Sequence, residues 1–202
     1  MPMSAQLSLL DGMHSVRSGM RDVATLREEW RVRILLVRHA EPETSPTVAP
    51  QQWPLSTAGR NAATRLMGRL PATGRWVTST EVKAYETLLC ARSDEALSIA
   101  QDARIDEVRR VEPFDDAFRA RRRAWIEGRL DMRHADWETP LEAAARFDEA
   151  ITEHARCAST LVIGSHGMVL TAWLVHARGA VAEHEAGAFW AAMAFPEVIE
   201  VP

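Results

Sequence analysis

Two histidines that each follow a short apolar run are the residues of this sequence best suited to do chemistry. His39 comes after the run 34–37 and Arg38, and His166 comes after a second such run, 161–164, and Ser165. Runs of this length and composition are typical of buried strands, so both imidazoles should lie at strand ends. A neutral imidazole can attack phosphorus, and a guanidinium beside it can hold phosphate oxygens. The pattern therefore predicts a site for phosphate chemistry.

The elements that must position these histidines alternate between strand and helix from Val32 onward, which is typical of an α/β sheet with crossover helices. Ligands of such sheets bind beyond the carboxyl ends of the strands, so both histidines should reach one cleft. We expect strands at 33–37, 75–78 and 160–163, helices at about 57–70, 82–92, 140–155 and 168–176, and an edge hairpin or single strand within 189–201.

Fixed positive charge should lie beside the two histidines. Arg38 precedes His39 directly, and Lys83 opens the helix that follows the strand ending near Ser79. The backbone N–H groups at the start of the helix after Gly167 should add donors with a favourable dipole. Because the strand ends converge in this class of fold, these groups are expected to form one phosphate pocket.

Four short motifs occur in a fixed order along the chain, and together they are more specific than any one alone. They are Arg38-His39-Ala40, residues 79–87, Ile105-Asp106-Glu107 and Ser165-His166-Gly167. Over about residues 33–173 the chain resembles the histidine phosphatase superfamily, which includes the phosphoglycerate mutases. The resemblance implies a three-layer α/β sandwich around a mostly parallel sheet, of the phosphoglycerate mutase type.

The resemblance also implies a role for each site residue. His39 would be the phosphorylated nucleophile, and Glu107 would be the proton donor. Arg38, Lys83 and His166 would form the phosphate pocket. No metal-binding spacing such as His-Glu-x-x-His occurs, so we expect neither a metal nor a cofactor.

Two positions depart from the motifs of the family. Ala40 stands where the family has Gly, which places a methyl group where the backbone would approach phosphate. Lys83 stands where the family usually has Arg, which keeps the charge but loses the two-pronged geometry of a guanidinium. Both changes bear on activity more than on the fold.

Glu107 lies in an acidic stretch, with Asp106, Glu112, Asp115 and Asp116 near it in sequence. A surface cluster of acids is the alternative interpretation of this stretch. If Glu107 is the proton donor, like charges and partial burial should raise its pKa. Asp106 is the next candidate for that role.

The predicted function is phosphomonoester hydrolysis through a phosphohistidine, on a small phosphorylated metabolite. A non-catalytic or weakly active phosphate-binding module and a phosphoglycerate mutase-type phosphotransferase remain alternatives. A mutase usually carries longer insertions than this chain has between Glu107 and His166. A serine hydrolase built on Ser165 is disfavoured, because the sequence around it lacks Gly-x-Ser-x-Gly spacing.

Composition sets the remaining expectations. The chain has 202 residues, 47% of them hydrophobic, a net charge of −4 and two cysteines. These values favour one catalytic domain over 32–202 after an extension over 1–31 whose role is not readable, with no drive toward nucleic acid or membranes. Cys90 and Cys157 are expected to be buried thiols of a cytoplasmic protein. A small phosphate ester is the expected partner, and the sequence does not indicate an oligomeric state.

The stretch 111–138 is irregular and rich in arginine, and we expect it to be a lid. Its run over 119–123 is interpreted as a solvated helix face, with contact between one member and an anionic substrate as the alternative. Substrate specificity should come from this stretch and from the proline-rich loop 42–54.

Overall fold

The computed structural model describes residues 32–201, except 114, 130–133 and 135. The expected extension over 1–31 therefore lies outside the described residues. Within them a sheet of five strands has the order β3-β2-β4-β1-β5. The strands are β1 Arg33–Arg38, β2 Arg75–Thr78, β3 Ile99–Gln101, β4 Thr160–Ser165 and β5 Glu197–Val201. β5 pairs with β1 in the antiparallel sense, and the other pairs are parallel.

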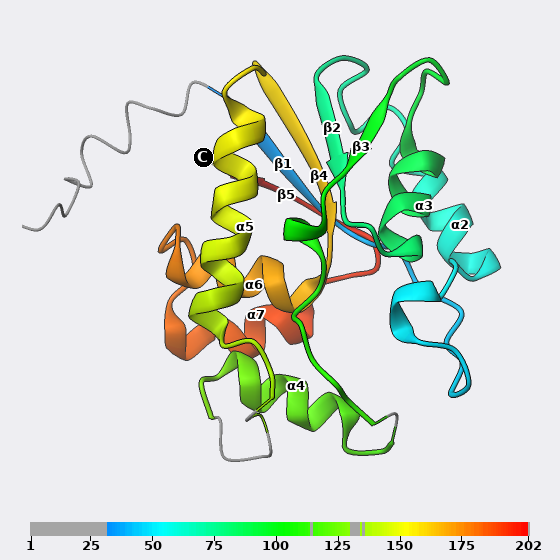
Figure 1. Ribbon diagram of the computed structural model, residues 1–202. Helices are drawn as coiled ribbons and strands as arrows, with labels where there is room; N and C mark the ends of the chain where they lie inside the picture. Colours follow the sequence, from blue (N-terminus) through cyan, green and yellow to red (C-terminus); the bar gives the residue numbers. More distant parts are fainter. Residues whose placement is uncertain (1–31, 114, 130–133, 135, 202) are drawn as a thin grey trace, which may run out of the picture. The chain divides into compact units, whose positions relative to one another are not determined.

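Helices cover both faces of the sheet (Figure 1). α5 (Pro140–Ala155) and α6 (Gly167–His176) lie on one face, and α2 (Thr57–Thr64) and α3 (Val82–Ala91) lie on the other. After their first residues β1 and β4 are buried throughout, as a strand between two helical layers must be. The predicted three-layer α/β sandwich around a mostly parallel sheet is confirmed.

The register of the two central strands brings the histidines together. Arg38 at the end of β1 lies opposite Ser165 at the end of β4. His39 and His166 are the residues that directly follow these two strands, so they leave the sheet side by side. Both strands run as uninterrupted apolar segments with the same direction, and their common end is the floor of the site.

Local sequence signals set where two of the helices begin. The Thr139 side chain and Glu142 form a capping box at the start of α5, with Pro140 as the first helical residue. Ser56 caps α2 by accepting a hydrogen bond of 2.9 Å from the Gly59 backbone N–H. A Cβ on Gly59 would lie 2.1 Å from the Glu41 carbonyl oxygen, so only glycine allows α2 to pack against the loop after β1.

Several elements differ from the sequence-based expectation. α2 ends at Thr64 and continues as turns rather than helix, and residues 189–192 belong to helix α7 (Ala186–Ala192) rather than to a hairpin. The expected alternative of a single strand is met by β5, which lies at one edge of the sheet. β3 has only three residues and no apolar run, so periodicity could not reveal it. The 111–138 stretch contains a regular helix, α4 (Phe118–Ile126).

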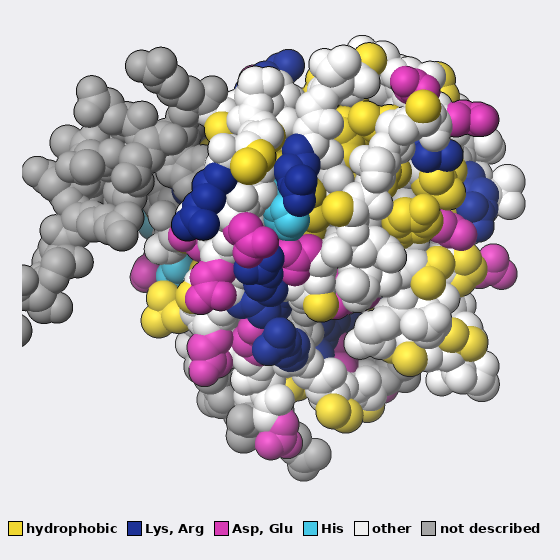
Figure 2. Space-filling view, turned by 45° about the horizontal axis from the view of Figure 1, so that its top comes forward, with side chains coloured by type: hydrophobic (Ala, Val, Ile, Leu, Met, Phe, Trp, Pro, Cys, Tyr) yellow, Lys and Arg dark blue, Asp and Glu magenta, His cyan; other side chains and the backbone are white. Residues whose placement is uncertain are grey.

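Three further properties concern the cysteines, the surface charges and the helices. Cys90 is half-buried and Cys157 is exposed, and both are free, so the expectation that both thiols are buried is wrong for Cys157. Basic and acidic side chains lie next to one another over the face shown in Figure 2, so that face has no wide patch of one sign. No helix in the described part of the chain is both long and apolar enough to cross a membrane.

Candidate active site

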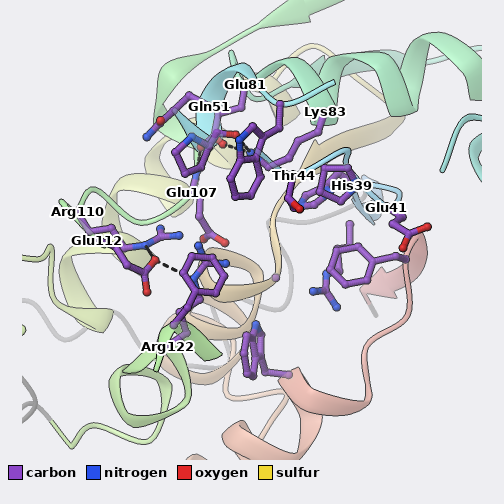
Figure 3. Close-up of a pocket in the computed structure, with 18 of the residues that line it drawn as sticks. His39, Glu41, Thr44, Gln51, Glu81, Lys83, Glu107, Arg110, Glu112 and Arg122 are labelled. Carbon is purple, nitrogen blue, oxygen red and sulfur yellow. Dashed lines mark hydrogen bonds and ion pairs between the residues drawn. The ribbon is translucent and has the colours of Figure 1, made fainter. Parts of the chain in front are cut away.

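A cavity of about 510 Å³ opens beyond the carboxyl ends of β1 and β4 (Figure 3). Its wall includes four of the five residues predicted for the site, namely Arg38, His39, Lys83 and Glu107. The fifth, His166, is fully buried directly behind His39, with 5.1 Å between the ring centroids. The structure therefore brings all five together, in two layers.

His39 is held in one tautomer. Its Nδ1 lies 2.7 Å from the Ala40 carbonyl oxygen, which can only accept, so Nδ1 carries the proton. The remaining nitrogen, Nε2, then has the lone pair. Burial, together with the nearby His166 and Lys83, keeps the pKa of His39 well below its usual value. His39 is thus a neutral imidazole with one nucleophilic nitrogen.

His166 is fixed by a chain of hydrogen bonds. The Ser79 hydroxyl donates to Asp106 at 2.7 Å, so it must accept from His166 Nε2, which lies 2.8 Å away. In the neutral ring Nδ1 is then the unprotonated nitrogen, and it is buried without a partner among the described residues. Burial and the charge of Lys83 lower the pKa of His166. Nδ1 of His166 is therefore the nitrogen that can still form a hydrogen bond.

Arg38 contacts the loop between α7 and β5. Its Nη1 donates to the Met193 carbonyl, and its guanidinium stacks on Phe195 at 3.5 Å. Nε is buried and has no partner among the described residues. A Cβ on Gly167 would lie 3.2 Å from this nitrogen, so the glycine leaves room for the arginine. Burial lowers the pKa of Arg38 to about 10, which still leaves it charged at neutral pH.

Lys83 forms a buried ion pair that the sequence did not reveal. Its Nζ donates to the carboxylate of Glu81 and, at 2.8 Å, to the Pro50 carbonyl. The side chains of Lys83 and Glu81 are only 7% and 5% exposed. Burial lowers the pKa of Lys83, while Glu81 opposes that shift. With two of its three donors in use, the ammonium keeps one for a ligand.

Glu107 lies on the start of α6. Its Oε1 accepts from the backbone N–H groups of Val108 and Val169, both at 3.0 Å, and Oε2 accepts from that of Met168 at 3.4 Å. The helix donors expected for phosphate are therefore occupied by a carboxylate of the protein. Helix N-termini favour such negative charge.

The predicted direction of the Glu107 pKa shift is wrong. Burial acts to raise the pKa, but the charges of Arg110, His166 and Arg122 outweigh it, and the pKa lies below its usual value. Three of the acidic neighbours in sequence, Asp106, Glu112 and Asp115, pair with other groups. Glu112, for example, pairs with arginines rather than crowding Glu107.

Asp106 and Ser165 have structural roles. The Asp106 carboxylate accepts from the Ser79 hydroxyl and from both the N–H and the hydroxyl of Thr80, at 2.6 to 2.7 Å. The Ser165 hydroxyl donates to the Ile105 carbonyl at 2.7 Å. Asp106 holds the loop after β2, and Ser165 anchors the segment that carries Glu107. Neither side chain lines the cavity.

The methyl group of Ala40 does not reach the cavity. It is fully buried in a small apolar cluster with Leu55 and Ala63, against which Cys90 packs. The Ala40 N–H donates to the Thr87 hydroxyl at 2.9 Å. The methyl group expected where the backbone would approach phosphate is therefore packed into the core instead.

The outer part of the cavity carries a second group of charges (Figure 3). Glu112 Oε2 accepts from Nε of Arg110 at 2.9 Å and from Nε of Arg122 at 3.0 Å. Arg122 also stacks on Phe118 at 3.5 Å. Arg122 belongs to the run interpreted as a solvated helix face, and that interpretation is wrong for this residue, whose side chain is 17% exposed.

Sequence reasoning missed Glu81, Arg110 and Arg122. Glu81 stood inside the second motif, two residues before Lys83, and the joint presence of an acid and a lysine there was the available signal. Nothing in the sequence distinguished Arg110 and Arg122 from their neighbours. Among the described residues, no group of three or more His, Cys, Asp or Glu side chains is arranged to hold a metal ion.

Comparison with known families decides the relationship. The model of the histidine phosphatase superfamily (branch 1) matches residues 34–189, which include all four motifs. The chain belongs to the histidine phosphatase superfamily. The resemblance found in the sequence is thereby confirmed.

Solved structures share the fold of this histidine phosphatase superfamily member. Bacillus stearothermophilus YhfR is 24% identical, with a TM-score of 0.65 over 85% of this chain and 92% of its own. A mycobacterial glucosyl-3-phosphoglycerate phosphatase with inorganic phosphate is 20% identical, with a TM-score of 0.58 over 78% and 83%.

A third solved structure is similar at the same level. An Escherichia coli protein described as a putative alpha-ribazole-5'-P phosphatase is 20% identical, with a TM-score of 0.54 over 79% of this chain and 84% of its own. At these identities the likeness concerns the fold. A search of curated proteins gives no match.

Proposed function

We propose that this protein is a phosphomonoester hydrolase that acts through a phosphohistidine at His39 on a small phosphorylated metabolite. The observation that carries the proposal is the hydrogen bond from His39 Nδ1 to the Ala40 carbonyl at 2.7 Å. It leaves Nε2 unprotonated on a ring that lines the cavity. Membership of the histidine phosphatase superfamily supports the same role.

The phosphoryl group would be bound by the cations around His39. Arg38 offers its unpaired Nε and Lys83 offers its third N–H. Once protonated, His166 Nδ1 would donate to an oxygen of a phosphoryl group bound at His39, and the phosphate charge would favour that protonation. Charge developing on the equatorial oxygens would thus meet three preorganised donors.

The leaving group needs a proton, and Glu107 is the carboxyl group we assign to supply it. In the free protein its pKa is low, so Glu107 must take up a proton when substrate binds. A bound phosphate dianion raises the pKa of a nearby carboxylate by like-charge repulsion, and closure of the site adds desolvation.

The two half-reactions then balance. His39 Nε2 forms a bond to phosphorus while the ester P–O bond breaks, and Glu107 gives its proton to the departing oxygen. In the second half, ionised Glu107 takes a proton from water, whose oxygen attacks phosphorus and breaks the N–P bond. Inorganic phosphate leaves, and His39 returns to its neutral form.

The direct test is turnover of a panel of phosphate esters that includes sugar phosphates, nucleotides and phosphoglycerates, because the structural neighbours include a glucosyl-3-phosphoglycerate phosphatase and a putative alpha-ribazole-5'-P phosphatase. Alkaline quenching with a labelled substrate should trap label on the protein that is stable to alkali and labile to acid. His39→Ala should abolish both signals, and His184→Ala, an exposed histidine outside the cavity, is the matched control.

Three results separate the alternatives. Binding of phosphate without turnover of any ester would favour a non-catalytic phosphate-binding module. Transfer of label to a second metabolite instead of to water would favour a mutase. Loss of activity on addition of a chelator, or full activity of His39→Ala, would refute the phosphohistidine mechanism.

A further inference from the structure

The outer end of the cavity holds two arginines on one carboxylate. Arg110 and Arg122 both direct Nε at Glu112 Oε2, and their side chains are 9% and 17% exposed against 5% for Glu112. Buried charges are usually balanced one against one, because an unpaired buried charge is costly. Arg121 is more distant, with its Nε 3.9 Å from Glu112 Oε1, and it pairs more closely with Asp115 at 2.9 Å and does not line the cavity.

The second acid near these arginines does not neutralise them by contact. Glu107 lies between the outer group and His39 (Figure 3), and its oxygens accept from backbone N–H groups. Among the described residues no ion pair within 4.0 Å joins Glu107 to either arginine. Glu107 would also lose its charge during the proposed reaction, which would leave the outer arginines with Glu112 alone.

Arg122 is held in a geometry suited to an anion. One face of its guanidinium lies on Phe118 at 3.5 Å, and Nε is bonded to Glu112. Its two Nη atoms have no acceptor within the described part of the chain, although the side chain lines the cavity. A planar guanidinium fixed on one face and at one edge is preorganised to bind a carboxylate or phosphate with two parallel hydrogen bonds.

Arg110 adds a second cation to the same place. Its Nη1 donates to the Val108 carbonyl at 2.8 Å, which fixes the guanidinium beside Glu112. Burial and repulsion from Arg110 lower the pKa of Arg122 to about 10. An anion bound between them would relieve that repulsion.

We propose that Arg110 and Arg122 form a second anion subsite, so that the preferred substrates are phosphate esters with a second anionic group, a carboxylate or a further phosphate, at the end remote from the scissile bond. The inference rests on the proposed function in that it places the phosphoryl group at His39. A cavity of about 510 Å³ has room for a small ester that spans both ends.

Binding of unreactive probes tests this subsite without turnover. The probes are short alkylphosphonates of matched chain length that end in methyl, in carboxylate or in a second phosphonate, with calorimetry as the readout. Wild-type protein should bind the doubly anionic probes roughly ten- to a hundredfold more tightly than the methyl probes, the usual range for a charge-assisted pair. The carboxylate and phosphonate arms show which anion the subsite prefers.

Three variants should change the preference for a second anion in different ways. Arg122→Gln should remove most of the preference for a second anion. Glu112→Gln should increase that preference, because it removes the internal carboxylate that competes for both arginines. Arg123→Gln removes an arginine of the same helix that is exposed and paired with Glu127, and it should leave the preference unchanged.

The outcomes also separate this inference from the proposed function. A preference that depends on Arg122, found in a protein with no turnover of any ester, would keep the subsite and overturn the hydrolase. Turnover with no preference for a second anion would overturn the subsite alone. Equal losses for methyl and carboxylate probes in Arg122→Gln, or a weaker preference in Glu112→Gln, would assign these side chains to the fold and overturn the subsite.

Discussion

The inner and outer ends of the cavity are built in different ways. The inner end is carried by the ends of β1 and β4, whose register places His39 beside His166. The outer end is carried by the segment from Glu107 to α4, where Arg110, Glu112 and Arg122 hold one another. Strand ends in a buried sheet have little freedom, whereas ion pairs within the outer segment help to hold its side chains in place.

This difference indicates a division of labour. A rigid frame suits groups that must meet phosphorus within a fraction of an ångström, and charges on a loop and helix suit groups that select among substrates. Changes at the inner end should therefore lower kcat for every ester. Changes at the outer end should act on KM and on the ranking of substrates.

Loss of the nucleophile should have the largest effect. We expect His39→Asn to lower kcat by on the order of 10⁴-fold or more for all esters alike, the scale on which removal of a nucleophile acts. Single-turnover kinetics with the best ester of the panel is the measurement. A loss that differed strongly between esters would show that the inner end also selects substrates. That result would contradict the assignment of catalysis to the inner end and selection to the outer end.

Glu107→Gln should show a contrast between leaving groups. We expect a loss of about 10²- to 10⁴-fold for alkyl phosphates and a much smaller loss for aryl phosphates, because a phenolate departs without protonation. The kcat for both classes is measured across pH. Equal losses for both would place Glu107 in binding or in anchoring the start of α6 rather than in proton transfer.

Substitutions in the ion pair of Lys83 and Glu81 should have the next largest effect on kcat. Lys83→Ala is expected to cost about 10²-fold in kcat, the usual scale for one stabilising donor. Glu81→Gln should cost less, because the lysine keeps its bond to the Pro50 carbonyl. The two losses should not add in the double variant, since one side chain positions the other.

Lys83→Arg sharpens this test. A guanidinium can bond two phosphate oxygens, so kcat should be kept or raised provided that Glu81 still pairs with it. Turnover of Lys83→Ala at the wild-type rate would show that the lysine is not part of the phosphate site.

The smallest effect concerns stability. His39 and His166 have pKa values lowered in the folded state, so the unfolded chain binds more protons below about pH 6.5. Stability is therefore fully present above that pH and falls as the pH drops, by up to about 1.4 kcal/mol per pH unit for each histidine. Urea unfolding of wild type and His39→Asn at pH 7 and pH 5 measures it, and the variant should show the shallower decline.

The inner end of the cavity was easier to predict from the sequence than the outer end. His39, Arg38 and His166 were predictable because buried strands leave a clear apolar signal and their ends meet. The backbone partners of Glu107 were not, because Met168 and Val169 are distant from it in sequence. The fall in its pKa was not predictable either, because the charges of Arg110, His166 and Arg122 outweigh burial only once the fold brings them near.

Parts of the fold escaped prediction for a related reason. β3 is short and only half-buried, so tertiary pairing with β2 rather than its own pattern makes it a strand. Arg122 and Arg123 are adjacent in one helix, and only packing against Phe118 and Glu112 distinguishes a cavity residue from an exposed one.

On the ribosome, β1 emerges long before β4 and β5, its two neighbours in the sheet. The contacts of Arg38 form late, because its partners Met193 and Phe195 come from the loop before β5. Until then β1 is an apolar strand with two unpaired edges, a form that is prone to aggregate. Activity regained during refolding will therefore report the docking of the last strand, and not the first collapse of the chain.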